Sequence, residues 1–91
     1  MAERTVVVAS QVGLHARPAK LFTQAAAAAG LKVTIAKGDG PAVDAASILR
    51  VMALAVKHGD EVTIAAEGEG ADEALDRLAE MLATDLDAVQ A

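Results

Sequence analysis

The residues most able to do chemistry lie together near the N-terminus, in the segment Gly13-Leu14-His15-Ala16-Arg17-Pro18-Ala19. A neutral imidazole is a good nucleophile near neutral pH, because its unperturbed pKa is about 6.5. An arginine two residues later offers a planar fork of N–H donors that matches phosphate oxygens. His15 and Arg17 therefore indicate a histidine that accepts a phosphoryl group and passes it on.

The same segment predicts the start of a helix over residues 16–29. Gly13 allows a sharp turn before the helix, and Pro18 is tolerated in a first turn because its missing N–H would have no partner there. The remaining first-turn N–H groups are unpaired, and the helix dipole adds partial positive charge. We therefore expect Ala16, Arg17 and Pro18 to form a phosphate-binding helix end.

Hydrophobic spacing along the rest of the chain predicts alternating strands and helices. Strands are expected at residues 5–9, 31–37, 41–43 and 61–66, and further helices at residues 47–54 and 71–84. Apolar strand faces and helix stripes together predict helices packed over one face of a sheet. The pattern alone leaves several α+β arrangements open, including a ferredoxin-like sheet.

The chain resembles the HPr family, the small histidine phosphocarriers of the bacterial phosphoenolpyruvate-dependent sugar phosphotransferase system. The resemblance rests on the segment from Gly13 to Ala19, on Ser47-Ile48-Leu49-Arg50-Val51-Met52 and on Ala66-Glu67-Gly68-Glu69, and it covers nearly the whole chain. It implies one HPr domain over residues 1–91. The implied fold is an α+β open-faced β-sandwich, an antiparallel four-stranded sheet with three helices on one face, in the order β-α-β-β-α-β-α.

The resemblance also implies the function. His15 would take a phosphoryl group on Nδ1 from phosphorylated enzyme I and give it to the IIA unit of a sugar permease, with Arg17 holding the group. The protein would be a stoichiometric carrier rather than an enzyme, without cofactor or metal. Two alternatives stay open: a carrier of a regulatory, nitrogen-type branch, and a non-catalytic regulatory binding module of the same fold. The intact His15-Ala16-Arg17 argues against the second alternative.

Ser47 precedes a short apolar run and is expected to cap its helix. In some branches of the family a serine kinase phosphorylates this residue, which implies regulatory phosphorylation and contacts with transcriptional regulators. A phosphate there would add about −1.5 to −2 charge at a helix N-terminus.

An exposed apolar patch is predicted beside His15, on the helix that follows Ser47. Ile48, Leu49 and Met52 cannot all point inward from so short a helix together with Val51 and Leu54. The resemblance implies that some of the first three dock onto partner proteins. Arg50 and Lys20 are expected to steer that docking, with Lys37 a further candidate.

Four positions depart from the pattern of the family. Val12 stands where many members carry a small polar residue near the phosphohistidine, so one donor to the phosphoryl group is missing. Asp44 and Ala46 replace residues that are often asparagine and lysine, which makes the serine region less basic. Ala55 replaces a glycine that is common after the short helix.

Composition narrows the class of protein. The chain has no cysteine, which excludes disulfides and thiolate metal sites, and its net charge of −5 with scattered basic residues argues against nucleic-acid binding. Glu3 and Arg4 precede only a short apolar run, so we expect no signal peptide and no membrane insertion. The sequence thus predicts a cytoplasmic monomer. His58 lies in a turn signal and is expected to be exposed, not a metal partner of His15, and replaceable with little effect on transfer.

Overall fold

The chain folds in the predicted order β-α-β-β-α-β-α. The computed structural model describes residues 2–9, 13–14 and 16–84. Its elements are β1 (Ala2–Val7), α1 (Ala16–Ala28), β2 (Val33–Lys37), β3 (Val43–Asp44), α2 (Ile48–Ala53), β4 (Glu61–Ala66) and α3 (Ala71–Ala83).

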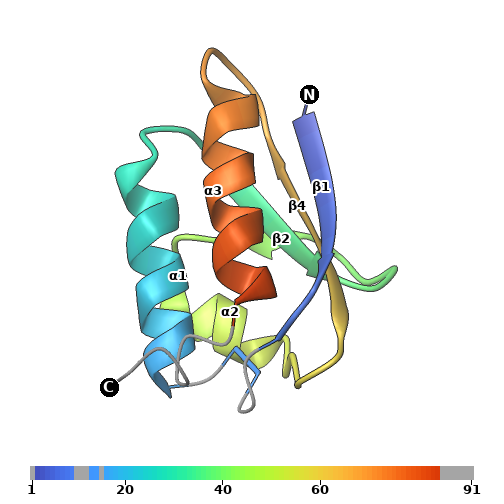
Figure 1. The fold of residues 1–91 in the computed structure, drawn as a ribbon. Helices are drawn as coiled ribbons and strands as arrows, with labels where there is room; N and C mark the ends of the chain where they lie inside the picture. Colours follow the sequence, from blue (N-terminus) through green and yellow to red (C-terminus); the bar gives the residue numbers. More distant parts are fainter. Residues whose placement is uncertain (1, 10–12, 15, 85–91) are drawn as a thin grey trace.

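The four strands form one antiparallel sheet in the order β1-β4-β2-β3. Figure 1 shows the three helices gathered on one side of this sheet, with α1 and α3 lying side by side across it. The open-faced sandwich implied by the family resemblance is therefore confirmed. Within the parts of the chain that the structure describes, no helix is long and apolar enough to cross a lipid bilayer.

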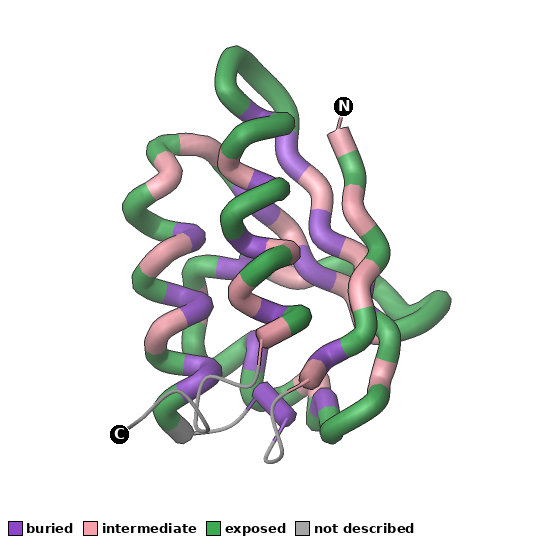
Figure 2. Tube along the Cα trace, in the orientation of Figure 1, coloured by how far each residue is buried: buried purple, intermediate pink, exposed green. Residues whose placement is uncertain are grey.

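The core lies between the sheet and the helices, and strand alternation decides which residues enter it. Along β4, Val62 and Ile64 are fully buried while their neighbours reach the outer face, and Figure 2 shows the same alternation of buried and accessible residues. The helices supply the opposing layer from residues at helical spacing. Its buried members include Ala19, Phe22 and Ala26 of α1, Val51 of α2, and Leu75, Leu78 and Leu82 of α3.

Strand β1 starts three residues earlier than predicted and ends at Val7 rather than residue 9. The predicted start is wrong because two adjacent charged residues, Glu3 and Arg4, are not typical of a strand. In the structure both belong to β1, and strand alternation places their side chains on opposite faces of the sheet. Arg4 lies on the helix side, where Nε donates to Asp76 (2.9 Å) and Nη2 donates to Asp72 (3.2 Å) of α3. The bond between Arg4 and Asp76 joins residues that are 72 positions apart, and it helps to hold β1 in place beside β4 from residue 2 onward.

Two other strand boundaries are also shifted. β3 contains Val43 and Asp44 and excludes Pro41, which cannot donate to a strand ladder. β2 starts at Val33, so that Leu31, predicted within this strand, lies in the preceding turn and is only partly buried. Both changes leave the buried faces as predicted, since Val33 and Ile35 point into the core.

The end of α2 carries backbone strain at Ala55. This residue has φ +56° and lies just after the C-cap Leu54, and its N–H donates to the Met52 carbonyl (3.1 Å). Helices commonly end on a left-handed residue, most often glycine, because a Cβ disfavours that conformation by about 1–2 kcal/mol. The departure from the family's glycine at this position therefore has a structural cost.

We expect Ala55→Gly to raise the free energy of unfolding by about 0.5–1 kcal/mol, which is the strain released less the extra freedom of glycine in the unfolded chain. The matched control is Ala53→Gly, the same change two residues earlier inside α2, which should lower it by about 0.5–1 kcal/mol. Urea unfolding of both variants measures this. Equal signs for the two substitutions would contradict the assignment of strain to Ala55.

Candidate functional site

The backbone that leads into α1 is fixed against a distant loop. Gly13 has φ +68°, and a Cβ at this position would lie 2.1 Å from the Val56 carbonyl oxygen. The next residue, Leu14, is buried and its N–H donates to the same oxygen (3.1 Å). Gly13 thus makes the predicted sharp turn, and it also permits an approach that no other residue allows.

Helix α1 begins at Ala16, as the sequence predicts. Arg17 is exposed in the first turn, whereas Pro18 is buried against the core. The first turn of the helix therefore carries an arginine that is exposed to solvent. His15 lies outside the described residues, as do Ser10, Gln11 and Val12, so the structural setting of the histidine and the effect of Val12 remain predictions.

Ser47 caps α2, which confirms the structural role predicted for it. Its backbone is extended, and its hydroxyl oxygen accepts a hydrogen bond from the Arg50 N–H (3.4 Å). Asp44 supports the same turn, because its carboxylate accepts from the Ala46 N–H (2.9 Å). The aspartate that departs from the family pattern therefore works as a local turn acceptor.

The predicted apolar patch is present on α2. Leu49 is 80% exposed, and Ile48 and Met52 are 39% and 37% exposed, while Val51 on the opposite side of the helix is fully buried. We call Ile48, Leu49 and Met52 the α2 patch. α2 packs against α1 and lies level with the first turns of α1 in Figure 1. The α2 patch is thus next to the α1 N-terminus, with the exposed side chains of Lys20 and Arg50 on these two helices.

Lys37, the further steering candidate, is engaged elsewhere. Its Nζ lies 3.4 Å from an Asp60 carboxylate oxygen and donates to the Ala55 carbonyl (3.1 Å). Asp60 also accepts from the Lys57 N–H (2.8 Å), and this bond, followed by the nearby Lys37, lowers the pKa of the Asp60 carboxyl. Lys37 and Asp60 thus fasten the loop after α2 to β2.

The lowered pKa of Asp60 predicts a loss of stability in acid. A carboxyl whose pKa is lower in the folded state stabilises the protein above its unfolded pKa of about 4, and this contribution is lost as the pH falls through the folded value. We expect Asp60→Asn to be less stable than wild type near pH 7, with the difference shrinking below about pH 4.

Urea unfolding at several pH values checks this expectation. Asp39→Asn is the matched control, since Asp39 is exposed in the turn after β2. A difference between wild type and Asp60→Asn that stays constant across the acid range would contradict a stabilising carboxylate at this position.

His58 is exposed, as predicted, but it has a contact that the sequence does not indicate. Its Nδ1 lies 3.1 Å from the Ala9 carbonyl oxygen, 49 residues away in sequence. The turn signal at residues 57–60 predicts a loop there without showing which segment the loop meets. Across the described residues, no three His, Cys, Asp or Glu side chains gather as a metal site requires.

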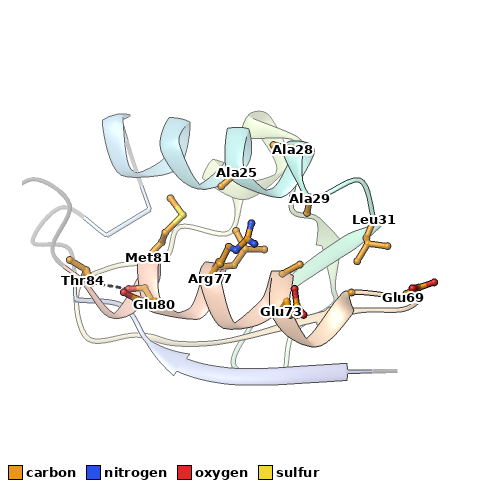
Figure 3. Close-up of a pocket in the computed structure, with 13 residues that line it drawn as sticks. Ala25, Ala28, Ala29, Leu31, Glu69, Glu73, Arg77, Glu80, Met81 and Thr84 are labelled. Carbon is orange, nitrogen blue, oxygen red and sulfur yellow. Dashed lines mark hydrogen bonds between the residues drawn. The ribbon is translucent and has the colours of Figure 1, made fainter.

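A further hollow of the surface lies between two helices. A groove of about 770 Å³ runs between α1 and α3, with Ala25, Ala28 and Ala29 on one wall and Arg77 and Met81 on the other. Figure 3 shows the Arg77 side chain between the two helices. The small alanine side chains of α1 leave this space open. Among the residues that the structure describes, Arg17, Lys20, Ser47 and the α2 patch do not line it.

Comparisons with known proteins agree with the fold and the motifs. The family model described as "PTS HPr component phosphorylation site" matches residues 2–84. Phosphocarrier protein HPr of Streptomyces coelicolor is 52% identical over 87 residues, which are 96% of this chain and 94% of that protein. The crystal structure of HPr from Bacillus anthracis superposes with a TM-score of 0.84 at 42% identity, over 89% of this chain and 95% of the other.

A third relative carries a regulatory name. The crystal structure of Crh, a Bacillus subtilis catabolite repression protein described as a dimer with a swapping domain, has a TM-score of 0.71 at 42% identity and covers 93% of this chain and 97% of its own. Fold and matches together define a small phosphocarrier protein. The chain belongs to the HPr family, and it is a phosphocarrier component of the phosphotransferase system without catalytic activity of its own.

Proposed function

We propose that His15 carries the phosphoryl group between phosphorylated enzyme I and the IIA unit of a sugar permease. The observation that carries the proposal is the family match over residues 2–84, described by its phosphorylation site, together with the motif from Gly13 to Ala19. In each transfer a nitrogen–phosphorus bond forms on the acceptor histidine as the bond to the donor breaks. Because the bond that breaks and the bond that forms are both nitrogen–phosphorus bonds to histidine, the transfer needs no energy source beyond the first phosphorylation.

Arg17 and the first turn of α1 are proposed to hold the phosphoryl group. The Arg17 guanidinium is exposed, so it is available to pair with two phosphate oxygens, and the first-turn N–H groups add partial positive charge. Both interactions are stronger with the dianionic phosphoryl group than with a neutral imidazole. They would therefore favour the phosphorylated carrier without any metal ion.

The α2 patch is proposed to dock onto enzyme I and the IIA unit. It lies next to the α1 N-terminus, and apolar side chains with a methionine suit a surface that meets more than one partner. The exposed Lys20 and Arg50 flank it and are expected to raise association rates.

We expect Leu49→Glu to slow phosphoryl transfer from enzyme I by about ten-fold or more, because it places a charge in the centre of the docking surface. Its melting temperature should stay within a few degrees of wild type, since Leu49 is 80% exposed. Ala27→Glu is the control, with the same charge on an exposed position farther along α1. Normal transfer by a folded Leu49→Glu variant would contradict the docking role.

Phosphorylation of Ser47 is proposed as a second, regulatory function. Its support is the likeness to the catabolite repression protein Crh and the position of Ser47 as the N-cap directly before Ile48 and Leu49. A phosphate there is favoured by the helix N-terminus and would add negative charge beside the α2 patch. Incubation with ATP and a bacterial HPr serine kinase, with Ser47→Ala as control, tests it. Absence of Ser47 phosphate would leave only the carrier function.

Cytoplasmic location and a monomeric state are also proposed. The carrier's partners exchange phosphoryl groups by brief docking, which suits a small protein with its α2 patch uncovered. Crh is described as a swapped dimer, so the oligomeric state needs a direct measurement. Sedimentation at micromolar concentration is expected to give the mass of one chain.

A further inference from the structure

The segment that leads to His15 is held at both of its ends by one loop, residues 56–60. At the near end, the Val8 N–H donates to the Asp60 carbonyl (2.9 Å) and the Gly59 N–H donates to the Val8 carbonyl (2.9 Å). At the far end, the Leu14 N–H donates to the Val56 carbonyl (3.1 Å). The 56–60 loop therefore holds Val8 and Leu14, on either side of the segment that precedes α1, and the Ala9 N–H donates in addition to the Leu82 carbonyl of α3 (2.9 Å).

One side chain of the 56–60 loop adds to these backbone bonds. With its proton on Nδ1, the His58 ring donates to the Ala9 carbonyl oxygen (3.1 Å), one residue beyond the backbone bonds of Val8 to the same loop. We propose that His58 is a positioning residue for phosphoryl transfer, which fixes the start of the segment between Ala9 and His15. This inference rests on the proposed role of His15.

The loop is built to hold the imidazole in place. Two hydrogen bonds between Asp60 and Lys57 close the turn at residues 57–60. The Asp60 carboxylate accepts from the Lys57 N–H (2.8 Å), and the Asp60 N–H donates to the Lys57 carbonyl (3.0 Å). Lys37 of β2 anchors the same carboxylate (3.4 Å). A rigid turn holds its side chain at low entropic cost, so that a single hydrogen bond can restrain the neighbouring segment.

On this proposal, replacement of His58 has an effect on transfer, in contrast to the expectation drawn from the sequence. Small misplacements of a reacting group lower the rate of transfer strongly. Docking, in contrast, is proposed to use the α2 patch, which lies on another element than the 56–60 loop. Loss of the His58 hydrogen bond should therefore lower kcat for the carrier as a substrate of enzyme I and leave its KM unchanged.

The experiment compares His58→Ala with His58→Asn, whose amide nitrogen is the same number of bonds from the backbone as Nδ1. We expect kcat to fall about three- to ten-fold in His58→Ala, the range that one ordinary hydrogen bond supports, and to return most of the way in His58→Asn. Lys57→Ala, an exposed neighbour in the same loop, is the control and should match wild type. All variants should melt within a few degrees of one another.

Amide hydrogen exchange of Val8, Leu14 and Gly59, whose N–H groups bond between this segment and the 56–60 loop, gives a readout in the unphosphorylated protein that is independent of transfer. It should be faster in His58→Ala and close to wild type in His58→Asn. An unchanged kcat in His58→Ala, or equal loss in the alanine and asparagine variants, would overturn the proposal. If wild type itself took no phosphate, the carrier function would fail, while the exchange data would still decide whether His58 restrains the segment.

Discussion

His15→Ala is expected to take up no phosphoryl group from phosphorylated enzyme I. The variant removes the imidazole that serves as nucleophile and leaves Arg17, the α1 N-terminus and the α2 patch in place, so that docking without transfer should result. The core should be intact, because the neighbouring Leu14 and Pro18 keep their buried positions. Acid-labile, alkali-stable labelling from phosphoenolpyruvate, measured beside the melting temperature, checks both parts.

The same variant retains His58, the other histidine of the chain. It therefore also tests whether a second imidazole, here bonded to the Ala9 carbonyl, can accept the group. Acid-labile label on His15→Ala would contradict the assignment of the carrier role to His15.

Gly13→Ala is expected to cause the largest loss of stability of any single methyl addition at a glycine of this chain. The new Cβ would meet the Val56 oxygen at 2.1 Å, Lys57 Cα at 2.7 Å and Val56 C at 2.9 Å, all of them backbone atoms that cannot rotate away. Alanine also disfavours φ +68°. Overpacking and strain together predict a loss of about 2–5 kcal/mol, which is a large part of the stability of a small domain.

Gly30→Ala is the matched control for that substitution. Gly30 has a similar φ of +73°, and a Cβ there would meet nothing within 4 Å. It should lose only about 0.5–1 kcal/mol, which is the backbone strain of alanine less the lower freedom of alanine in the unfolded chain. Equal losses in the two variants, measured by urea unfolding, would show that the approach of Gly13 to Val56 is not a tight constraint.

Local patterns were enough to predict the order of elements, the cap at Ser47 and the exposure of Leu49. The alternation of Val62 and Ile64 and the spacing of Leu75, Leu78 and Leu82 fix which faces are buried, and Ser47 before an apolar run fixes where α2 starts. Such features depend on neighbours within one turn or one strand. The exposure of Leu49 follows in the same way, because a helix this short can bury only one side.

Contacts between distant segments could not be predicted in this way. Arg4 is accommodated in β1 because its guanidinium donates hydrogen bonds to Asp72 and Asp76 on α3. Nothing in residues 2–7 indicates those partners. The bond from His58 to Ala9 and the approach of Gly13 to Val56 likewise depend on how the 56–60 loop folds over the chain before α1. The backbone strain at Ala55 is likewise visible only in the structure, as a φ of +56°.

Phosphorus NMR of the wild-type protein, phosphorylated by phosphoenolpyruvate and catalytic enzyme I, tests the central claim most directly. We expect one phosphoramidate signal, with one phosphoryl group per chain, assigned to Nδ1 of His15 by its coupling to the ring protons. Addition of a IIA unit should discharge it. A phosphoryl group on His58, on a serine or on no residue at all would contradict the account.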